Sequence, residues 1–122
     1  MTTPVPVPVS AGGRELPHPR RAEIRLENVL QALADPMRLG IVRELAAAGG
    51  NELSCSQFDL PVTKSTSTHH FRVLRESGVV RQVYRGTAKL NGLREDDLDA
   101  LFPGLLGRVL DAATRQADRL GG

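Results

Sequence analysis

Two faces with opposite chemistry run along residues 64–77, a stretch without Gly or Pro. On a helix, positions i, i+3, i+4 and i+7 lie on one stripe, and a displacement of two residues turns the stripe by about 200°. One stripe is polar and contains no acid: Ser65, Thr68, His69 and Arg72. The opposite stripe carries the apolar side chains and must face inward: Ser67, His70, Phe71 and Leu74.

The polar stripe has the side chains that read DNA. Ser, Thr and His hydrogen-bond to base edges or phosphates, and an Arg pairs bidentately with guanine or with phosphate oxygens. The amides at the start of such a helix also favour phosphate, and Lys64 lies beside them. The alternative is an ordinary solvated face, but such faces more usually carry Glu and Lys. We therefore predict that this helix contacts DNA.

Positive charge is concentrated around the same helix. Residues 61–90 carry a net charge of +5, although the whole chain has only +2 and a sequence pI of about 9.2. The basic residues of this block are Lys64, Arg72, Arg75, Arg81, Arg85 and Lys89. Arg85 stands at a predicted hairpin tip, and from there it can follow the phosphates or enter the minor groove. Tyr84 either joins it there or packs inside.

The neighbouring sequence supplies the elements that position this stretch. The patterns predict an amphipathic helix over 22–34, a helix over 36–48 after Asp35 and a short segment over 51–60 with a short helix of about two turns after Ser54. They then predict a turn at residues 61–63, the helix 64–77, a hairpin over 79–93, a helix from Glu95 and a final helix from Leu105. Gly78 ends the helix 64–77. Three central helices followed by a hairpin predict a mainly α fold with a small β-hairpin, a winged helix-turn-helix.

Three segments resemble the ArsR family of bacterial winged-helix repressors. They are Leu33-Ala34-Asp35-Pro36-Met37-Arg38-Leu39, the run from Ser65-Thr66-Ser67-Thr68-His69-His70-Phe71 to Val80, and the Arg85-Gly86-Thr87 tip. The resemblance covers about residues 24–120. Ser67 departs from the apolar residue often found at its position, so inward packing is weaker at that turn.

The resemblance implies a homodimer whose recognition helices enter successive major grooves of double-stranded operator DNA. It implies that an inducer, here an unknown small molecule, releases the promoter, and that Lys64, Ser65, Thr68 and His69 are DNA contacts. Dimerisation would pair the first and last helices, where the candidate residues are Leu26, Val29, Leu30, Leu106, Val109 and Leu110.

The metal sites of that family have no match in this sequence. A soft metal needs several thiolates held close together, and the matching position here reads Ser54-Cys55-Ser56. The family's other pattern needs His on the last helix, yet residues 94–122 contain none. We therefore expect no metal and no cofactor. Cys55 is interpreted as a small packed residue, with a redox switch through an intersubunit disulfide or a sulfenic acid as the alternative.

Length and composition limit the remaining classes. The 122 residues suggest one domain, and a single cysteine forms no internal disulfide framework. Prolines alternate with valine over residues 4–9, which predicts a disordered tail over 1–20 and a folded domain over 21–122. We find neither a secretion signal nor a membrane span, so we expect a cytoplasmic protein without a membrane partner.

The sequence thus predicts a sequence-specific transcriptional regulator, a homodimeric repressor that does not use the family's metal sites. One alternative is a winged-helix protein-interaction module that has lost DNA binding, and another is a redox-responsive repressor acting through Cys55. An enzyme is not expected, because no phosphate-binding glycine loop, nucleophile elbow or HExxH motif is present.

Overall fold

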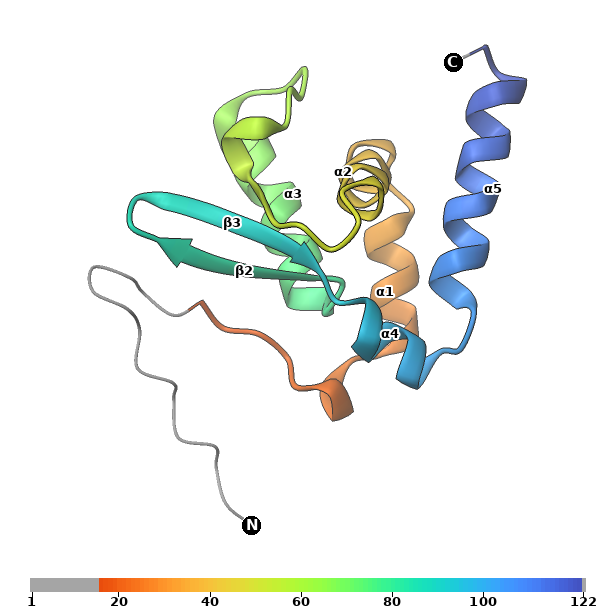
Figure 1. Cartoon of the computed structure of the whole chain (residues 1–122), viewed down its shortest axis with the longest axis horizontal. Helices are drawn as coiled ribbons and strands as arrows, with labels where there is room; N and C mark the ends of the chain where they lie inside the picture. The colour runs from red at the N-terminus through yellow and green to blue at the C-terminus, as the bar shows by residue number, and fades with distance from the viewer. Residues whose placement is uncertain (1–15, 122) are drawn as a thin grey trace.

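The computed structural model describes residues 16–121. Its helices lie to one side of a small antiparallel sheet (Figure 1). The elements in chain order are η1 (Arg21–Glu23), α1 (Leu26–Leu33), α2 (Pro36–Ala47), β1 (Leu53–Ser54), η2 (Cys55–Gln57), α3 (Lys64–Ser77), β2 (Val80–Arg85), β3 (Ala88–Leu93), α4 (Glu95–Leu101) and α5 (Leu105–Arg119). The predicted mainly α fold with a hairpin is confirmed.

Side-chain caps fix the starts of the two central helices. The carboxylate of Asp35 accepts a hydrogen bond from the Arg38 amide at 3.1 Å, and Pro36 occupies the first turn of α2. The hydroxyl of Thr63 accepts from the Thr66 amide at 3.2 Å and starts α3. Both helices therefore begin where the sequence predicts, and α3 has the predicted bounds.

The hairpin belongs to a three-stranded sheet with the order β1-β3-β2. Strands β2 and β3 pair along their full length, from Val80 opposite Leu93 to Arg85 opposite Ala88. The two-residue strand β1 was not predicted, because its residues show no alternating pattern of their own. It exists because Leu53 and Ser54 pair with the free edge of β3.

The first helix is shorter than predicted. Instead of one helix over 22–34, the chain has η1, two extended residues at Ile24 and Arg25, and then α1. The break lets the Ile24 side chain turn inward, where it is buried in the core against Gly78. Tertiary packing therefore overrides the helical pattern at this point.

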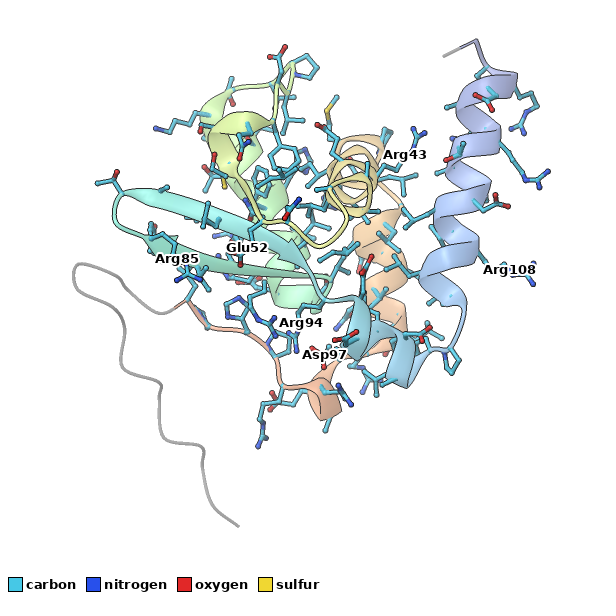
Figure 2. All side chains as sticks on the ribbon, in the orientation of Figure 1. Arg43, Glu52, Arg85, Arg94, Asp97 and Arg108 are labelled. Carbon is cyan, nitrogen blue, oxygen red and sulfur yellow. The ribbon has the colours of Figure 1, made fainter. Side chains whose placement is uncertain are left out.

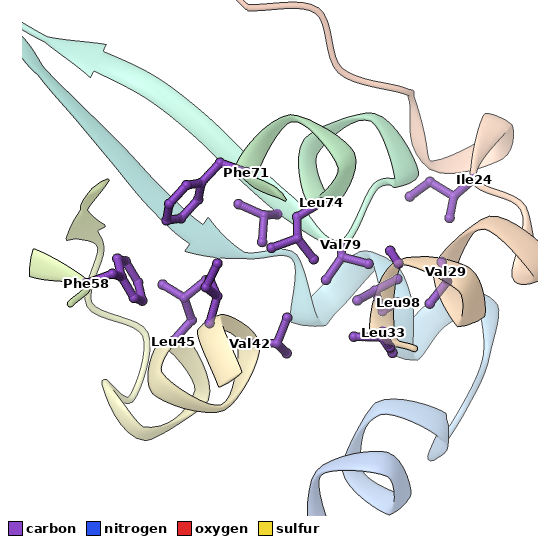
Figure 3. Packing of buried hydrophobic residues seen from close by; sticks show 13 residues of the cluster. Ile24, Val29, Leu33, Val42, Leu45, Phe58, Phe71, Leu74, Val79 and Leu98 are labelled. Carbon is purple, nitrogen blue, oxygen red and sulfur yellow. The ribbon is translucent and has the colours of Figure 1, made fainter. Parts of the chain in front are cut away.

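The hydrophobic core lies where α1, α2, α3 and the base of the hairpin meet (Figure 3). At one end, Phe58 and Phe71 contact edge to face with ring centroids 5.4 Å apart. At the other end, Ile24 and Val29 lie in the core together with Leu98 of α4. The core thus fixes α3 with its Phe71 face inward, as predicted.

The last part of the predicted tail is folded. Pro17, His18 and Pro19 each accept a hydrogen bond from the domain, donated by Arg75, the Gln82 amide and Arg94 respectively. The expected boundary at residue 20 is therefore wrong for residues 16–20, which we call the N-terminal strap. The rest of the predicted tail, residues 1–15, lies outside the described residues. Within residues 16–121, no helix is long and apolar enough to cross a membrane.

Replacing Gly78 by Ala tests the tight junction between α3 and β2. Gly78 has φ of 90°, and a Cβ there would lie 2.5 Å from Ile24 Cγ1. We expect Gly78→Ala to lower the free energy of unfolding by about 2–4 kcal/mol, because left-handed strain adds to overpacking. Urea denaturation measures this change.

Gly40→Ala is the matched control for this substitution. Gly40 lies within α2, and a Cβ there would meet nothing within 4 Å. Alanine is the better helix former, so we expect Gly40→Ala to raise stability by about 0.5–1 kcal/mol. Similar losses in both variants would contradict the packing described for Gly78.

Candidate nucleic-acid interface

Helix α3 presents its polar stripe to solvent. The side chains of Ser65, Thr68, His69 and Arg72 are all exposed, whereas His70, Phe71 and Leu74 are buried and Ser67 is half-buried. His69 Nδ1 lies 3.3 Å from a guanidinium nitrogen of Arg72, so these two groups are neighbours on the exposed surface. The predicted division of α3 into two faces is confirmed.

His70 is an inner-face residue, as the sequence predicts. Its Nδ1 lies 3.3 Å from the Arg38 guanidinium and 3.9 Å from the Asp35 carboxylate. Arg38 also donates to the carbonyl of Ala32 at 2.8 Å, at the end of α1. These contacts tie α1, α2 and α3 together behind the exposed stripe.

The hairpin projects beside α3 and carries its own basic residues (Figure 1). Arg85 lies at the end of β2 with its side chain 65% exposed, 3.9 Å from Glu52 (Figure 2). Lys89 lies opposite Tyr84, with its Nζ 5.5 Å from the ring centroid. Arg81 approaches Asp97 of α4 at 4.0 Å, so it stands at the base of the hairpin, away from the tip.

Arg75 is not part of the surface that the basic block predicts. Its side chain is buried and donates to Gln82 Oε1 at 2.7 Å and to the carbonyl of Pro17 at 3.2 Å. A buried guanidinium with these partners stabilises the interior of the protein through its hydrogen bonds and does not face solvent. The exposed charge around α3 and the hairpin tip is therefore smaller than the sequence count indicates.

A buried chain of hydrogen bonds continues from Arg75 across the sheet. Gln82 Nε2 donates to Asn91 Oδ1 at 2.8 Å, and Asn91 Nδ2 donates to the carbonyl of Leu53 at 3.1 Å. Gln82 and Asn91 are 1% and 0% exposed. We call Arg75, Gln82 and Asn91 the polar chain; it joins α3, β2, β3 and β1. Sequence reasoning missed it, because the hairpin sequence gives no sign that these two amides face inward.

Cys55 lies beside the polar chain. Asn91 Nδ2 is 3.2 Å from Cys55 Sγ, and Gln82 Nε2 is 3.8 Å away. The thiol is half-buried and packs against the core. In residues 16–121, no group of three or more His, Cys, Asp and Glu side chains could hold a metal ion.

The N-terminal strap covers the open edge of β2. His18 Nε2 accepts from the Gln82 amide at 3.0 Å, and Arg94 donates to the carbonyl of Pro19 at 2.8 Å. Arg94 in turn donates to Asp97 at 2.9 Å, where α4 meets the strap (Figure 2). Hydrogen bonds from Arg21 and Arg94 hold the pKa of Asp97 below its ordinary value.

Apolar side chains remain on the outside of α1 and α5. Leu26 and Leu30 are 42% and 45% exposed, and Leu106, Val109 and Leu110 on α5 are half-buried. Val29 is different, because it is 1% exposed inside the core. The expectation that Val29 contacts a second subunit is therefore wrong: on α1 its side chain points inward, whereas Leu26 and Leu30 point outward.

Comparison with known proteins agrees with this geometry. Residues 33–83, from the end of α1 into β2, match the family model described as a helix-turn-helix domain. The chain is 36% identical over 80 residues to the uncharacterized HTH-type transcriptional regulator YceK of Bacillus subtilis (strain 168), covering 64% of this chain and 79% of YceK.

Solved structures show the same fold. A crystal structure of an ArsR family transcriptional regulator has a TM-score of 0.57 at 21% identity, covering 68% of this chain and 90% of that chain. An ArsR-like transcriptional regulator from Rhodococcus sp. RHA1 has a TM-score of 0.52 at 27% identity, covering 77% and 83%. This chain belongs to the ArsR family of HTH-type transcriptional regulators. As an ArsR-family regulator, it is a DNA-binding protein and not an enzyme.

We expect the strap of this ArsR-family protein to make its stability depend on pH. His18 must be neutral at Nε2 to accept from Gln82, and burial, followed by the charges of Arg94, Arg75 and Arg81, lowers its pKa. The pKa of His18 is lower in the folded protein than in the unfolded chain. The stabilisation that His18 gives is therefore complete above about pH 6.5 and is lost as the pH falls below that value. We expect His18→Gln to remove this part of the pH dependence, measured by urea unfolding between pH 7.5 and 5.

His69→Gln is the control, because it makes the same substitution on the exposed stripe of α3, where His69 lies beside Arg72 and not beside the strap. It should keep the pH dependence of the unaltered protein. Equal pH profiles for His18→Gln and the unaltered protein would contradict the role given to His18.

Proposed function

We propose that this ArsR-family protein is a homodimeric repressor that binds operator DNA and is released from it by an inducer. The observation that carries this proposal is the exposed, acid-free stripe of α3 beside a basic hairpin tip. A helix presented in this way fits the major groove, while the hairpin reaches the adjacent minor groove.

The proposed roles follow from the chemistry of each side chain. Ser65, Thr68, His69 and Arg72 would face base edges and nearby phosphates. Lys64 stands at the start of α3, where its charge adds to the helix amides in attracting a phosphate. Arg85 would contact the backbone or the minor groove from the tip of the hairpin.

The apolar side chains on the outside of two amphipathic helices support the proposed dimer. Leu26 and Leu30 leave an exposed apolar strip on α1, and the strongly amphipathic α5, which carries Leu106, Val109 and Leu110, lies beside α1 (Figure 1). Burying these side chains against a second copy removes apolar surface from water. Pairing two copies through α1 and α5 would place two α3 helices for half-sites about 34 Å apart.

DNA binding is tested by the double variant His69→Ala, Arg72→Ala. We expect its affinity for duplex DNA from upstream of its own gene to fall at least about thirtyfold, since each lost contact is worth roughly 1–3 kcal/mol. Fluorescence anisotropy measures this, and the salt dependence of the unaltered dimer should have a slope of about −5 to −7 for six to eight neutralised phosphates.

The control is Arg115→Ala on α5, which also removes an exposed arginine but one paired with Asp111. We expect it to bind DNA normally. Salt-independent binding, or equal affinities for the double variant and the unaltered protein, would refute the proposed interface. If the double variant still captures a protein partner while neither form binds DNA, the interaction-module alternative holds instead.

The dimer is tested by Leu30→Asp. A charge on the exposed apolar strip of α1 should shift sedimentation from dimer to monomer at micromolar protein, because an unpaired carboxylate would be buried at the interface. Asn28→Asp introduces the same charge on an exposed position of α1 outside the strip and should leave the dimer intact. A dimeric Leu30→Asp protein would place the interface elsewhere.

A further inference from the structure

A cavity of about 610 Å³ lies between the first half of α3, the η2 region and the hairpin tip. Phe58 and Phe71 form its aromatic side, and Leu60 and Val62 add aliphatic surface. Phe58 and Phe71 belong to the core and Leu60 packs against it, so this side of the cavity is firmly held. Its volume is in the range of small-molecule sites.

The cavity is also basic. Lys64 at the start of α3 and Lys89 on β3 both line it, together with hydroxyl groups such as those of Ser54 and Ser67, and its lining contains no acid. Three other hollows in the described part of the chain each include a glutamate: Glu76 beside α1, Glu44 between α2 and α5, and Glu52 with Glu95 near β3. A cavity with aromatic lining, two ammonium groups and no carboxylate favours a ligand that is apolar apart from one negatively charged group.

We propose that this cavity binds a small aromatic anion, with the ring system against Phe58 and Phe71 and the carboxylate or sulfonate near Lys64 and Lys89. The ring gains contact with the small part of Phe58 and Phe71 that the cavity leaves uncovered and with the aliphatic side chains of Leu60 and Val62. The acidic group gains charge-assisted hydrogen bonds from two ammonium groups. Phosphate alone would leave the aromatic surface unused.

The position of the cavity links the ligand to DNA binding. Lys64 and Thr68 line it and are also proposed DNA contacts, so this part of the inference rests on the proposed function. A bound anion would neutralise Lys64 and occupy the space between α3 and the hairpin tip. Ligand and DNA would then weaken each other's binding by the same factor. The aromatic anion would therefore act as the inducer.

The probe is 8-anilinonaphthalene-1-sulfonate, and its uncharged analogue is N-phenyl-1-naphthylamine. Fluorescence titration of the full chain should show saturable binding of the sulfonate, about three- to tenfold tighter than binding of the neutral probe. Lys89→Gln should remove most of this difference, because it deletes one of the two charges. Ser67→Phe should abolish binding of both probes, because its ring fills the cavity.

Arg43→Gln is the matched control, since Arg43 lines the hollow between α2 and α5 and loses the same charge. Thermal unfolding establishes whether each variant is folded. If Ser67→Phe is not folded, Lys89→Gln alone tests the site. Equal affinity for the sulfonate in the unaltered protein and in the folded Lys89→Gln and Ser67→Phe variants would overturn the proposed site.

A competition arm separates this inference from the proposed function. Addition of the sulfonate should release labelled duplex DNA from the unaltered protein but not from Ser67→Phe, provided that variant binds DNA. Probe binding with the expected variant pattern, in a protein that binds no DNA, would support the site and refute the repressor. DNA binding that saturating sulfonate leaves unchanged would overturn the inducer role.

Discussion

A chain of buried hydrogen bonds from Arg75 through Gln82 and Asn91 to the carbonyl of Leu53 holds helix α3 and the hairpin in one arrangement. Each buried amide or guanidinium loses hydration on folding, and an unmade bond at such a site costs about 1–3 kcal/mol. No buried side-chain nitrogen or oxygen within the described residues lacks a partner. The interior therefore specifies how α3 lies against the sheet.

The surfaces to which we assign a function follow from this arrangement. With α3 fixed by Phe71, Leu74 and the polar chain, its opposite stripe must face solvent beside the hairpin. The N-terminal strap is attached to the same chain through Pro17 and Arg75, so it braces β2 from the outer edge. The cavity near Lys64 and Lys89 lies where α3 and the hairpin tip diverge. A ligand bound there would change the spacing between α3 and the hairpin, which the polar chain fixes.

Local signals made α3 predictable, whereas features that depend on distant partners were not. Thr63 and Gly78 mark both ends of α3 in the sequence, and its two stripes differ plainly in polarity. By contrast, the break at Ile24 depends on Gly78, more than fifty residues away, and the burial of Arg75 depends on Gln82 and Pro17. Helical spacing also placed Val29 on the same apolar stripe as its exposed neighbours, and only packing separates them.

The most direct test is a double-mutant cycle for DNA affinity between Asn91→Leu and Arg85→Ala, with unfolding curves establishing that each protein is folded. If the polar chain positions the hairpin, Arg85→Ala should weaken DNA binding about fivefold or more in the unaltered protein and by much less in the Asn91→Leu protein. The same fold loss in both proteins would show that the hairpin binds DNA independently of the polar chain, contrary to this account.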